Sequence, residues 1–482
     1  MIKLFENIIN ISIKQRFLVM ILVILISILG IYNYKKLPID AVPDITNVQV
    51  QINTLAQGYS PLESEQRITY VIETAMSGLP SLDYTRSVSK YGLSQITVVF
   101  KDGTDIYFGR KLISEKLQEI KEKLPPNIEP IMGPISTGLG EIFSYTIEAK
   151  NNVLKEDGTE YTPLDLKLIQ DWIIKPQLKT IKGVADINST GGYTKNYQIS
   201  PISEKLIEYK ISLDDVFEAV EKNNSNLGAG YIEKNGMQYV IRIPSQISSI
   251  DEINKILVKN ENGSKIFIKD IAKVFIGNEL RTGAATKDGK ETVMGTVFML
   301  VGENSKNVSE AVSKKLEKIS QSLPKGIITK TVYDRTILVD KTIDTVKKNL
   351  FEGAILVIVV LFFLLGNIKA ALITAMVIPL SMLFTITGML TNKISANLLS
   401  LGAIDFGIIV DGSVIIIENC IRCLAEKQKE LGRVLSKQER FEVIKSASSE
   451  VRKATMFGEL IIMIVYFPIL TLSGIEGKMF QP

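Results

Sequence analysis

Three acidic residues interrupt one of the most apolar stretches of the chain. Asp405, Asp411 and Glu418 lie within residues 394–421, a stretch without lysine, arginine or histidine. In a helix, Asp411 and Glu418 fall within about 20° of each other, and successive acids are about 9–10 Å apart along the axis. An aspartate at the centre of a span costs about 2.5–3.5 kcal/mol to insert, so such residues usually have a function.

Buried carboxyl groups could pass protons from one to the next. Desolvation raises the pKa of a carboxyl group towards the ambient pH, so that it can bind and release protons. The spacing of Asp405, Asp411 and Glu418 therefore predicts a proton relay. The alternative is a structural role, in which hydrogen bonds between helices neutralise the acids. For Glu418, near one end of the stretch, both roles stay open.

The composition excludes several other kinds of chemistry. The chain of 482 residues has no histidine, so it has no Ser-His-Asp or Cys-His site and no zinc site with histidine ligands. A net charge of +4 is too small to indicate a nucleic-acid partner. Two cysteines, Cys420 and Cys423, cannot form a disulfide scaffold. Their spacing could bind a metal, but without a second pair we favour helix packing. We expect no cofactor and no enzymatic activity.

Apolar stretches long enough to cross a membrane lie at both ends of the chain. A hydrophobic fraction of 46% and a positive mean hydropathy favour a membrane protein. Residues 17–31 follow a basic segment and precede no cleavage site, so we expect an uncleaved span. Residues 350–390 are too long for one span of about 20 residues, and the turn at 366–369 predicts a hairpin. With residues 394–421 and 456–472, the sequence predicts five spans.

The distribution of basic residues predicts the orientation of these spans. Residues 422–453 carry nine Lys or Arg and five Glu, so we expect this segment in the cytoplasm. The basic N-terminus and Lys369 then also lie inside, and residues from about 38 to 337 form a large outer region.

The outer region contains a repeated pattern of helix, Leu-Pro and strand. An amphipathic helix over residues 105–124 ends at Leu-Pro, and a similar helix over 308–323 ends in the same way. Strands are predicted at 49–54 and 95–100. The repeat predicts duplicated ferredoxin-like βαβ subdomains, with a separate module inserted into the second copy. A helix over 163–181 is expected to place the sole tryptophan, Trp172, in the core.

With these features in view, nearly the whole sequence resembles the resistance–nodulation–division superfamily of proton-driven exporters, and within it the heavy-metal efflux branch. The similarity is carried by several motifs together, which lie at residues 38–44, 58–63, 102–105, 133–141, 279–285 and 333–335. In the drug-exporting branch, the helix that corresponds to the one with Asp411 has two adjacent aspartates. In this chain Gly412 follows Asp411, as in the metal branch.

The resemblance implies a polytopic α-helical membrane protein with a large α+β periplasmic region. It implies that Asp405, Asp411 and Glu418 are the proton relay of a secondary transporter, a proton antiporter, in the bacterial inner membrane. Periplasmic adaptor and outer-membrane channel proteins are the implied partners, and the full-length form is expected to be a homotrimer.

The resemblance also indicates which cation is exported. Copper and silver exporters of this kind use methionines, because soft thioethers suit monovalent ions. Leu399 replaces one of these methionines here. Glu141 matches an acid in the porter cleft of divalent-metal exporters, so zinc, cobalt, nickel or cadmium is favoured. A solvated loop acid is the alternative for Glu141.

The resemblance divides the chain into nine segments. They are an N-terminal interfacial helix and first span (1–33), a first porter subdomain (34–132), the first part of a second porter subdomain (133–180), a docking subdomain (181–278), the second part of the second porter subdomain (279–335), spans 2–4 (336–421), a cytoplasmic loop (422–453), span 5 (454–474) and a truncated end (475–482).

Full members of the superfamily resemble two such halves in tandem, so we expect this chain to be the N-terminal half of a permease. It would be a fragment, the product of an interrupted gene or one half of a split pump. The alternatives for function are a multidrug or lipid exporter of the same superfamily and a membrane receptor or scaffold that transports nothing.

Overall fold

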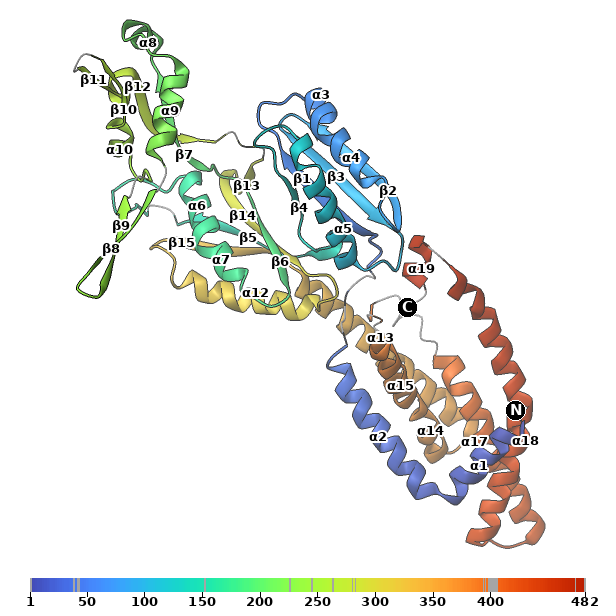
Figure 1. Cartoon of the computed structure of the whole chain (residues 1–482). Coiled ribbons are helices and arrows are strands. Elements are labelled where there is room, and N and C mark those ends of the chain that lie inside the picture. Colours follow the sequence, from blue (N-terminus) through green and yellow to red (C-terminus); the bar gives the residue numbers. More distant parts are fainter. Residues whose placement is uncertain are drawn as a thin grey trace.

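The computed structural model of the chain has an outer region of sheets and a region of long helices (Figure 1). It describes residues 2–37, 40, 44–150, 153–224, 227–243, 246–261, 264–279, 281, 283–392, 394, 396–397, 406–472 and 474–480. In Figure 1 the outer region occupies one end of an elongated molecule, and the long helices occupy the other.

The first unit of the outer region is a four-stranded antiparallel sheet in the order β2-β3-β1-β4. Apolar residues of the central strands pack against two helices to form its core. The predicted strands and the predicted helix over 105–124 are confirmed. The elements are β1 (Val48–Leu55), α3 (Pro61–Ser64), η1 (Glu65–Thr69), α4 (Tyr70–Met76), β2 (Leu82–Lys90), β3 (Leu93–Phe100), α5 (Ile106–Glu119), η2 (Lys121–Lys123) and β4 (Pro130–Met132).

The second unit repeats this chain path. Its sheet has the order β6-β14-β5-β15, with the short strand β13 also paired to β14. The elements are η3 (Gly138–Gly140), β5 (Glu141–Ala149), α6 (Pro163–Ile169), η4 (Gln170–Ile174), α7 (Lys175–Leu178), β6 (Val184–Thr190), β13 (Ala285–Lys287), β14 (Lys290–Met299), α12 (Ser305–Ser320) and β15 (Ile327–Asp334).

The two units have the same strand order, and a third, the inserted unit, lies between β6 and β13 of the second. The predicted boundary at residue 181 assigns β6 to the insertion, whereas β6 pairs with β14. The elements of the inserted unit therefore begin at β7. They are β7 (Lys195–Pro201), α8 (Ser203–Glu208), α9 (Leu213–Asn223), β8 (Leu227–Lys234), β9 (Met237–Ile243), α10 (Ile250–Asn254), β10 (Leu257–Glu261), β11 (Ser264–Phe267), α11 (Ile268–Ile271) and β12 (Ala272–Asn278).

The expected core position of Trp172 is wrong, since its side chain is 76% exposed. Trp172 lies in the π-helical turn η4, where Gln170 and Ile174 are both fully buried. Two residues four apart that face the sheet leave the residue midway between them on the opposite side. The sheet contact of Gln170 and Ile174 thus turns the tryptophan towards solvent.

The long helices form the other region of the molecule. They are α1 (Ile2–Lys14), α2 (Arg16–Tyr34), α13 (Arg335–Leu365), α14 (Ile368–Ala375), α15 (Val377–Thr391), α17 (Phe406–Leu431) and α18 (Lys437–Tyr466), followed by η5 (Phe467–Thr471) and α19 (Gly474–Phe480). Helix α1 and the turns between α13 and α14 and between α17 and α18 lie at the end away from the sheets (Figure 1). The segments predicted to be cytoplasmic thus share one end.

Among the described residues, two helices are long and apolar enough to cross a membrane, Arg16–Tyr34 and Ile368–Thr391, and the apolar helix Phe457–Thr471 is shorter. The predicted hairpin is confirmed, because Gly366 ends α13 in a left-handed conformation and the Asn367 side chain caps α14. The five-span topology stays a prediction.

The predicted span over 394–421 is helical only from Phe406 among its described residues. Ile394 and Ala396–Asn397, at the start of the predicted span, are not helical. The carbonyl of Ala396 accepts a hydrogen bond of 2.9 Å from the backbone N–H of Asp40. This segment therefore binds the chain that leaves α2, instead of continuing a helix.

Candidate functional site

Helix α17 carries two of the three predicted relay acids, Asp411 and Glu418; Asp405 lies outside the described residues. The two acids are seven residues apart, so they lie near one face of the helix with a rise of about 10 Å between them. Val410 and Val414, which lie beside this face, pack against α13, α14 and α15. Apolar contacts therefore fix the rotation of α17 about its axis, and this rotation sets the direction of the acids.

Asp411 and Glu418 are both exposed in this structure. Neither carboxylate has a hydrogen bond or an ion pair with a residue in the described part of the chain. The interhelical hydrogen bonds of the structural alternative are thus not present within that part. The acids lie on a surface of α17 that the described helices leave open.

The inner end of α17 packs on α18 through small polar contacts. The amide of Asn419 donates to the carbonyl of Ala447, and Cys420 Sγ lies 3.4 Å from Ser448 Oγ. Both cysteines are free thiols. Across the described residues, no group of three or more Cys, Asp or Glu could hold a metal ion. These contacts support helix packing for the cysteine pair.

Glu141, the predicted metal ligand, is exposed at the start of β5, directly after the turn η3. In the sheet register, Phe298 of β14 lies between Glu141 and Asp186 of β6. Asp186 forms an ion pair of 2.6 Å with Lys179. Glu141 can supply one carboxylate to a cation, and the described residues around it do not complete a metal site.

A buried ion pair joins the outer region to the long helices. Arg335, the first residue of α13, is 5% exposed and donates to Asp40 Oδ1 at 2.8 Å. It also donates to the carbonyl of Leu139, two residues before Glu141, at 3.3 Å. Arg335 thus links the chain after α2, the start of α13 and the turn before Glu141.

This junction could not be predicted from the sequence. Asp40 and Arg335 both lie in motifs that carry the resemblance, but they are 295 residues apart in the sequence. No local pattern pairs residues at such a separation. The motifs were the only signal available, and they do not reveal which residue of one binds which residue of the other.

A second charged cluster lies on the sheet of the second unit. Partial burial would raise the pKa of Glu148, but hydrogen bonds from Lys287, Thr146 and Lys330 outweigh it and lower the pKa to about 2. The lysines come from β13 and β15, on either side of the two central strands. Glu148 therefore joins strands across the sheet as a carboxylate.

Comparison with known proteins now identifies the family. Residues 8–482 match the model of the AcrB/AcrD/AcrF family. The chain belongs to this family. Protein HelA of Legionella pneumophila is 61% identical over 477 residues, which are 99% of this chain and 45% of HelA. The cobalt-zinc-cadmium resistance protein CzcA of Cupriavidus metallidurans is 59% identical over 479 residues, with the same two coverages.

A solved structure agrees with the AcrB/AcrD/AcrF assignment. A crystal structure of a heavy metal efflux pump matches with a TM-score of 0.86 and 33% identity, covering 98% of this chain and 45% of that one. This AcrB/AcrD/AcrF chain therefore spans about half the length of the relatives it matches. The resemblance drawn from the sequence motifs, including that to the heavy-metal efflux branch, is confirmed.

Proposed function

We propose that the chain is the N-terminal half of a proton-driven exporter of heavy-metal cations. The observation that carries this proposal is the position of Asp411 and Glu418 on an open surface of α17, in a chain 59% identical to a cobalt-zinc-cadmium resistance protein. Proton entry at these acids, together with Asp405, would drive metal export, and the pump would act as a proton antiporter.

In this proposal, the surface of α17 that carries Asp411 and Glu418 is open because the remainder of the pump would cover it. Unpaired carboxylates in a membrane are costly, so they require either water or basic partners. The chain covers 45% of the length of its relatives, and the remainder of such a pump would pack over Asp411 and Glu418. Basic groups from that remainder would hold the acids in their charged form until protons replace them.

The substrate we propose is a divalent cation such as zinc, cobalt, nickel or cadmium. Carboxylate ligands such as Glu141 suit these ions better than monovalent copper or silver. Two of the three relatives reported above are named for cobalt, zinc and cadmium resistance or for heavy-metal efflux. This supports metal export over a multidrug or lipid exporter and over a receptor or scaffold.

We propose a multi-pass protein of the bacterial inner membrane with the two units and the inserted unit in the periplasm. The repeated strand order supports duplicated ferredoxin-like porter subdomains, and the inserted unit, now from about residue 191 to 278, would be the docking subdomain. A homotrimer with a periplasmic adaptor and an outer-membrane channel follows from the resemblance.

The relay is tested by metal tolerance in cells that produce the chain with the remainder of the pump. Asp411→Asn keeps the size of the side chain but cannot exchange protons, so we expect loss of zinc and cobalt tolerance. Glu426→Gln is the matched control, because Glu426 is an exposed acid on the same helix whose described partner is Arg422. Full tolerance with Asp411→Asn, at equal protein level, would show that the relay proposal is wrong.

The metal ligand is tested separately with Glu141→Gln. We expect the variant to keep proton uptake into vesicles but to require a higher zinc concentration for transport. Glu129→Gln, another exposed acid of the outer region, should change neither quantity. An unchanged zinc dependence in the Glu141 variant would remove this residue from the cation path.

A further inference from the structure

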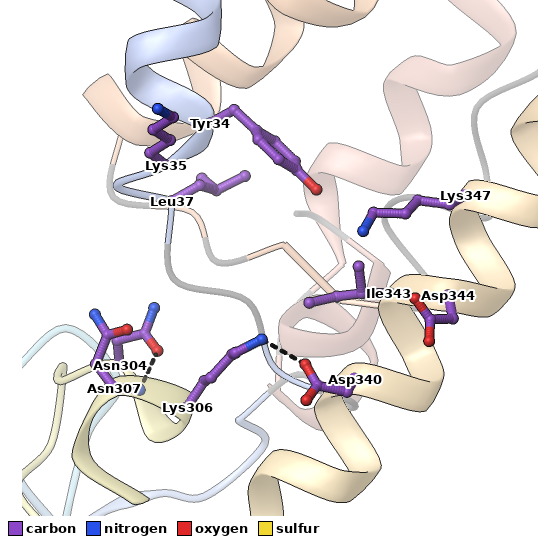
Figure 2. Close-up of a pocket in the computed structure, with 10 residues that line it drawn as sticks. All are labelled: Tyr34, Lys35, Leu37, Asn304, Lys306, Asn307, Asp340, Ile343, Asp344 and Lys347. Carbon is purple, nitrogen blue, oxygen red and sulfur yellow. Dashed lines mark hydrogen bonds and ion pairs between the residues drawn. The ribbon is translucent and has the colours of Figure 1, made fainter. Parts of the chain in front are cut away.

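A cavity of about 390 Å³ lies where the outer region meets the membrane helices. Its wall is formed by the end of α2, the N-terminus of α12 and the first part of α13 (Figure 2). The volume is within the range of about 300–1,000 Å³ that is typical of small-molecule sites. Its lining contains three lysines and two aspartates and is therefore strongly polar.

Only one of these lysines is neutralised by an ion pair within the described residues. Lys306 forms a close ion pair with Asp340, and this hydrogen bond raises the pKa of its ammonium group. Lys347 and Asp344 have no hydrogen bond or ion pair with any described residue. Both line the cavity, so the wall presents an unpaired cation and an unpaired anion one turn apart on α13.

The phenol of Tyr34 adds a hydrogen-bond donor to the unpaired cation. Figure 2 shows its hydroxyl and the Lys347 ammonium group directed towards one another over the cavity. The N-terminus of α12, a helix of 16 residues, also borders the cavity at Asn304. Its peptide dipoles add positive potential there. This side of the cavity suits an anion with several oxygen atoms.

The cavity lies at the depth expected for lipid head groups. Tyr34 is the last residue of the span-length helix α2, and Lys35 follows it. Tyrosine and lysine at the end of a span usually lie in the membrane interface. On α13, the apolar part begins at Gly353, six residues after Lys347, which is a rise of about 9 Å.

We propose that this cavity binds the phosphoethanolamine head group of a phospholipid from the outer leaflet. Lys347 and the Tyr34 hydroxyl hold the phosphate, and Asp344 holds the ammonium group. The acyl chains extend along the apolar surfaces of α2 and α13. This proposal is independent of metal export, since it uses neither Glu141 nor the acids of α17. The bound lipid braces the junction of α12 and α13 against the membrane.

Binding is measured by native mass spectrometry of the full chain with short-chain phosphatidylethanolamine, phosphatidylglycerol and inorganic phosphate. We expect phosphatidylethanolamine to bind best. Lys347→Gln should lower the affinity for both lipids by about tenfold, because the variant loses one charge-assisted contact to the phosphate. Asp344→Asn should weaken phosphatidylethanolamine alone, because phosphatidylglycerol has no ammonium group.

Two controls keep the test decisive. Lys348→Gln changes the neighbouring lysine, which pairs with Glu352 outside the cavity, and should leave binding unchanged. Tyr34→Phe removes only a hydroxyl and should weaken binding even if Lys347→Gln disturbs the fold. If all variants bind phosphatidylethanolamine as tightly as the unchanged chain does, the proposal is overturned. Inorganic phosphate that binds as tightly as phosphatidylethanolamine also overturns it, since the site would then recognise a soluble anion.

Discussion

The first unit and the second unit have the same strand order, and the earlier helix of each contains a π-helical turn over the sheet. In the first unit Thr69 of η1 is hydrogen-bonded to Ser94 and Ser89. In the second, Gln170 of η4 accepts from Tyr145 and donates to Ser189. Each turn thus directs one buried polar side chain into a small network on the sheet.

The units differ in how they are attached to the long helices. The second unit continues directly into α13, and the buried Arg335 fastens this junction to Asp40. The first unit is held near α19 by Lys478, which contacts Asp102 at 2.6 Å across a partly exposed surface. Loss of one partner of the first contact would leave a buried charge without compensation, whereas solvent screening makes the second contact weak. Motion of α13 would therefore reach the second unit first.

The largest expected effect comes from Arg335→Met. Removing one partner of a buried pair costs about 3–5 kcal/mol, and we expect the low end because Asp40 is partly exposed. Hydrogen exchange followed by mass spectrometry should show faster opening of β15 and the start of α13. Lys478→Met is the matched change in the first unit and should cost no more than about 1 kcal/mol. Equal effects would contradict the difference between the two attachments.

The next effect concerns a glycine beneath a buried ring in each unit. In Gly295→Ala the new Cβ would lie 2.3 Å from Cζ of Tyr145 on the neighbouring strand, and we expect a loss of about 1–3 kcal/mol. In Gly109→Ala the Cβ meets the Phe100 ring at 2.8 Å. Alanine also favours helix α5 by about 1 kcal/mol, so the net loss should be smaller. Denaturant unfolding measures the free energy that each variant loses. A larger loss for Gly109→Ala than for Gly295→Ala would contradict the prediction.

The polar networks under the π-helical turns should have similar strengths. Tyr145→Phe leaves the buried Gln170 oxygen without its donor at 2.8 Å, which costs about 1–3 kcal/mol. Thr69→Val leaves Ser94 and Ser89 without their shared partner, and we expect about 1–2 kcal/mol. Hydrogen exchange of each sheet reports the local loss. If Thr69→Val left the stability of the first sheet unchanged, only the second unit would depend on its network.

The smallest effect is the contribution of Glu148, in the second unit, to the dependence of stability on pH. The pKa of Glu148 is lowered from 4.5 to about 2, so its ion pairs stabilise the fold fully above pH 4.5. This contribution is lost as the pH falls from 4.5 towards 2, because protonation removes the carboxylate. Glu148→Gln should reduce the dependence, as measured by unfolding between pH 5 and 3. An unchanged slope in the variant would mean that other groups cause it.

Much of the outer region could be predicted from local patterns. The Leu-Pro ends of α5 and α12 and the alternating strands β1 and β3 depend on residues close in sequence, because helix and strand periods involve neighbours. The turn at Gly366 and the acids of α17 were predicted for the same reason. Each of these features needs only a short window of the chain.

Which distant residues meet depends on the packed core and not on a local pattern. The pairing of β6 with β14, the outward position of Trp172 and the contact of Asp40 with Arg335 could not be predicted, since sheet register and helix rotation depend on the whole packed core. Residue types and their local order are enough to show which residues can ionise in an apolar helix and where the chain turns. Packing determined which face of α17 those acids occupy, because apolar contacts at Val410 and Val414 set its rotation.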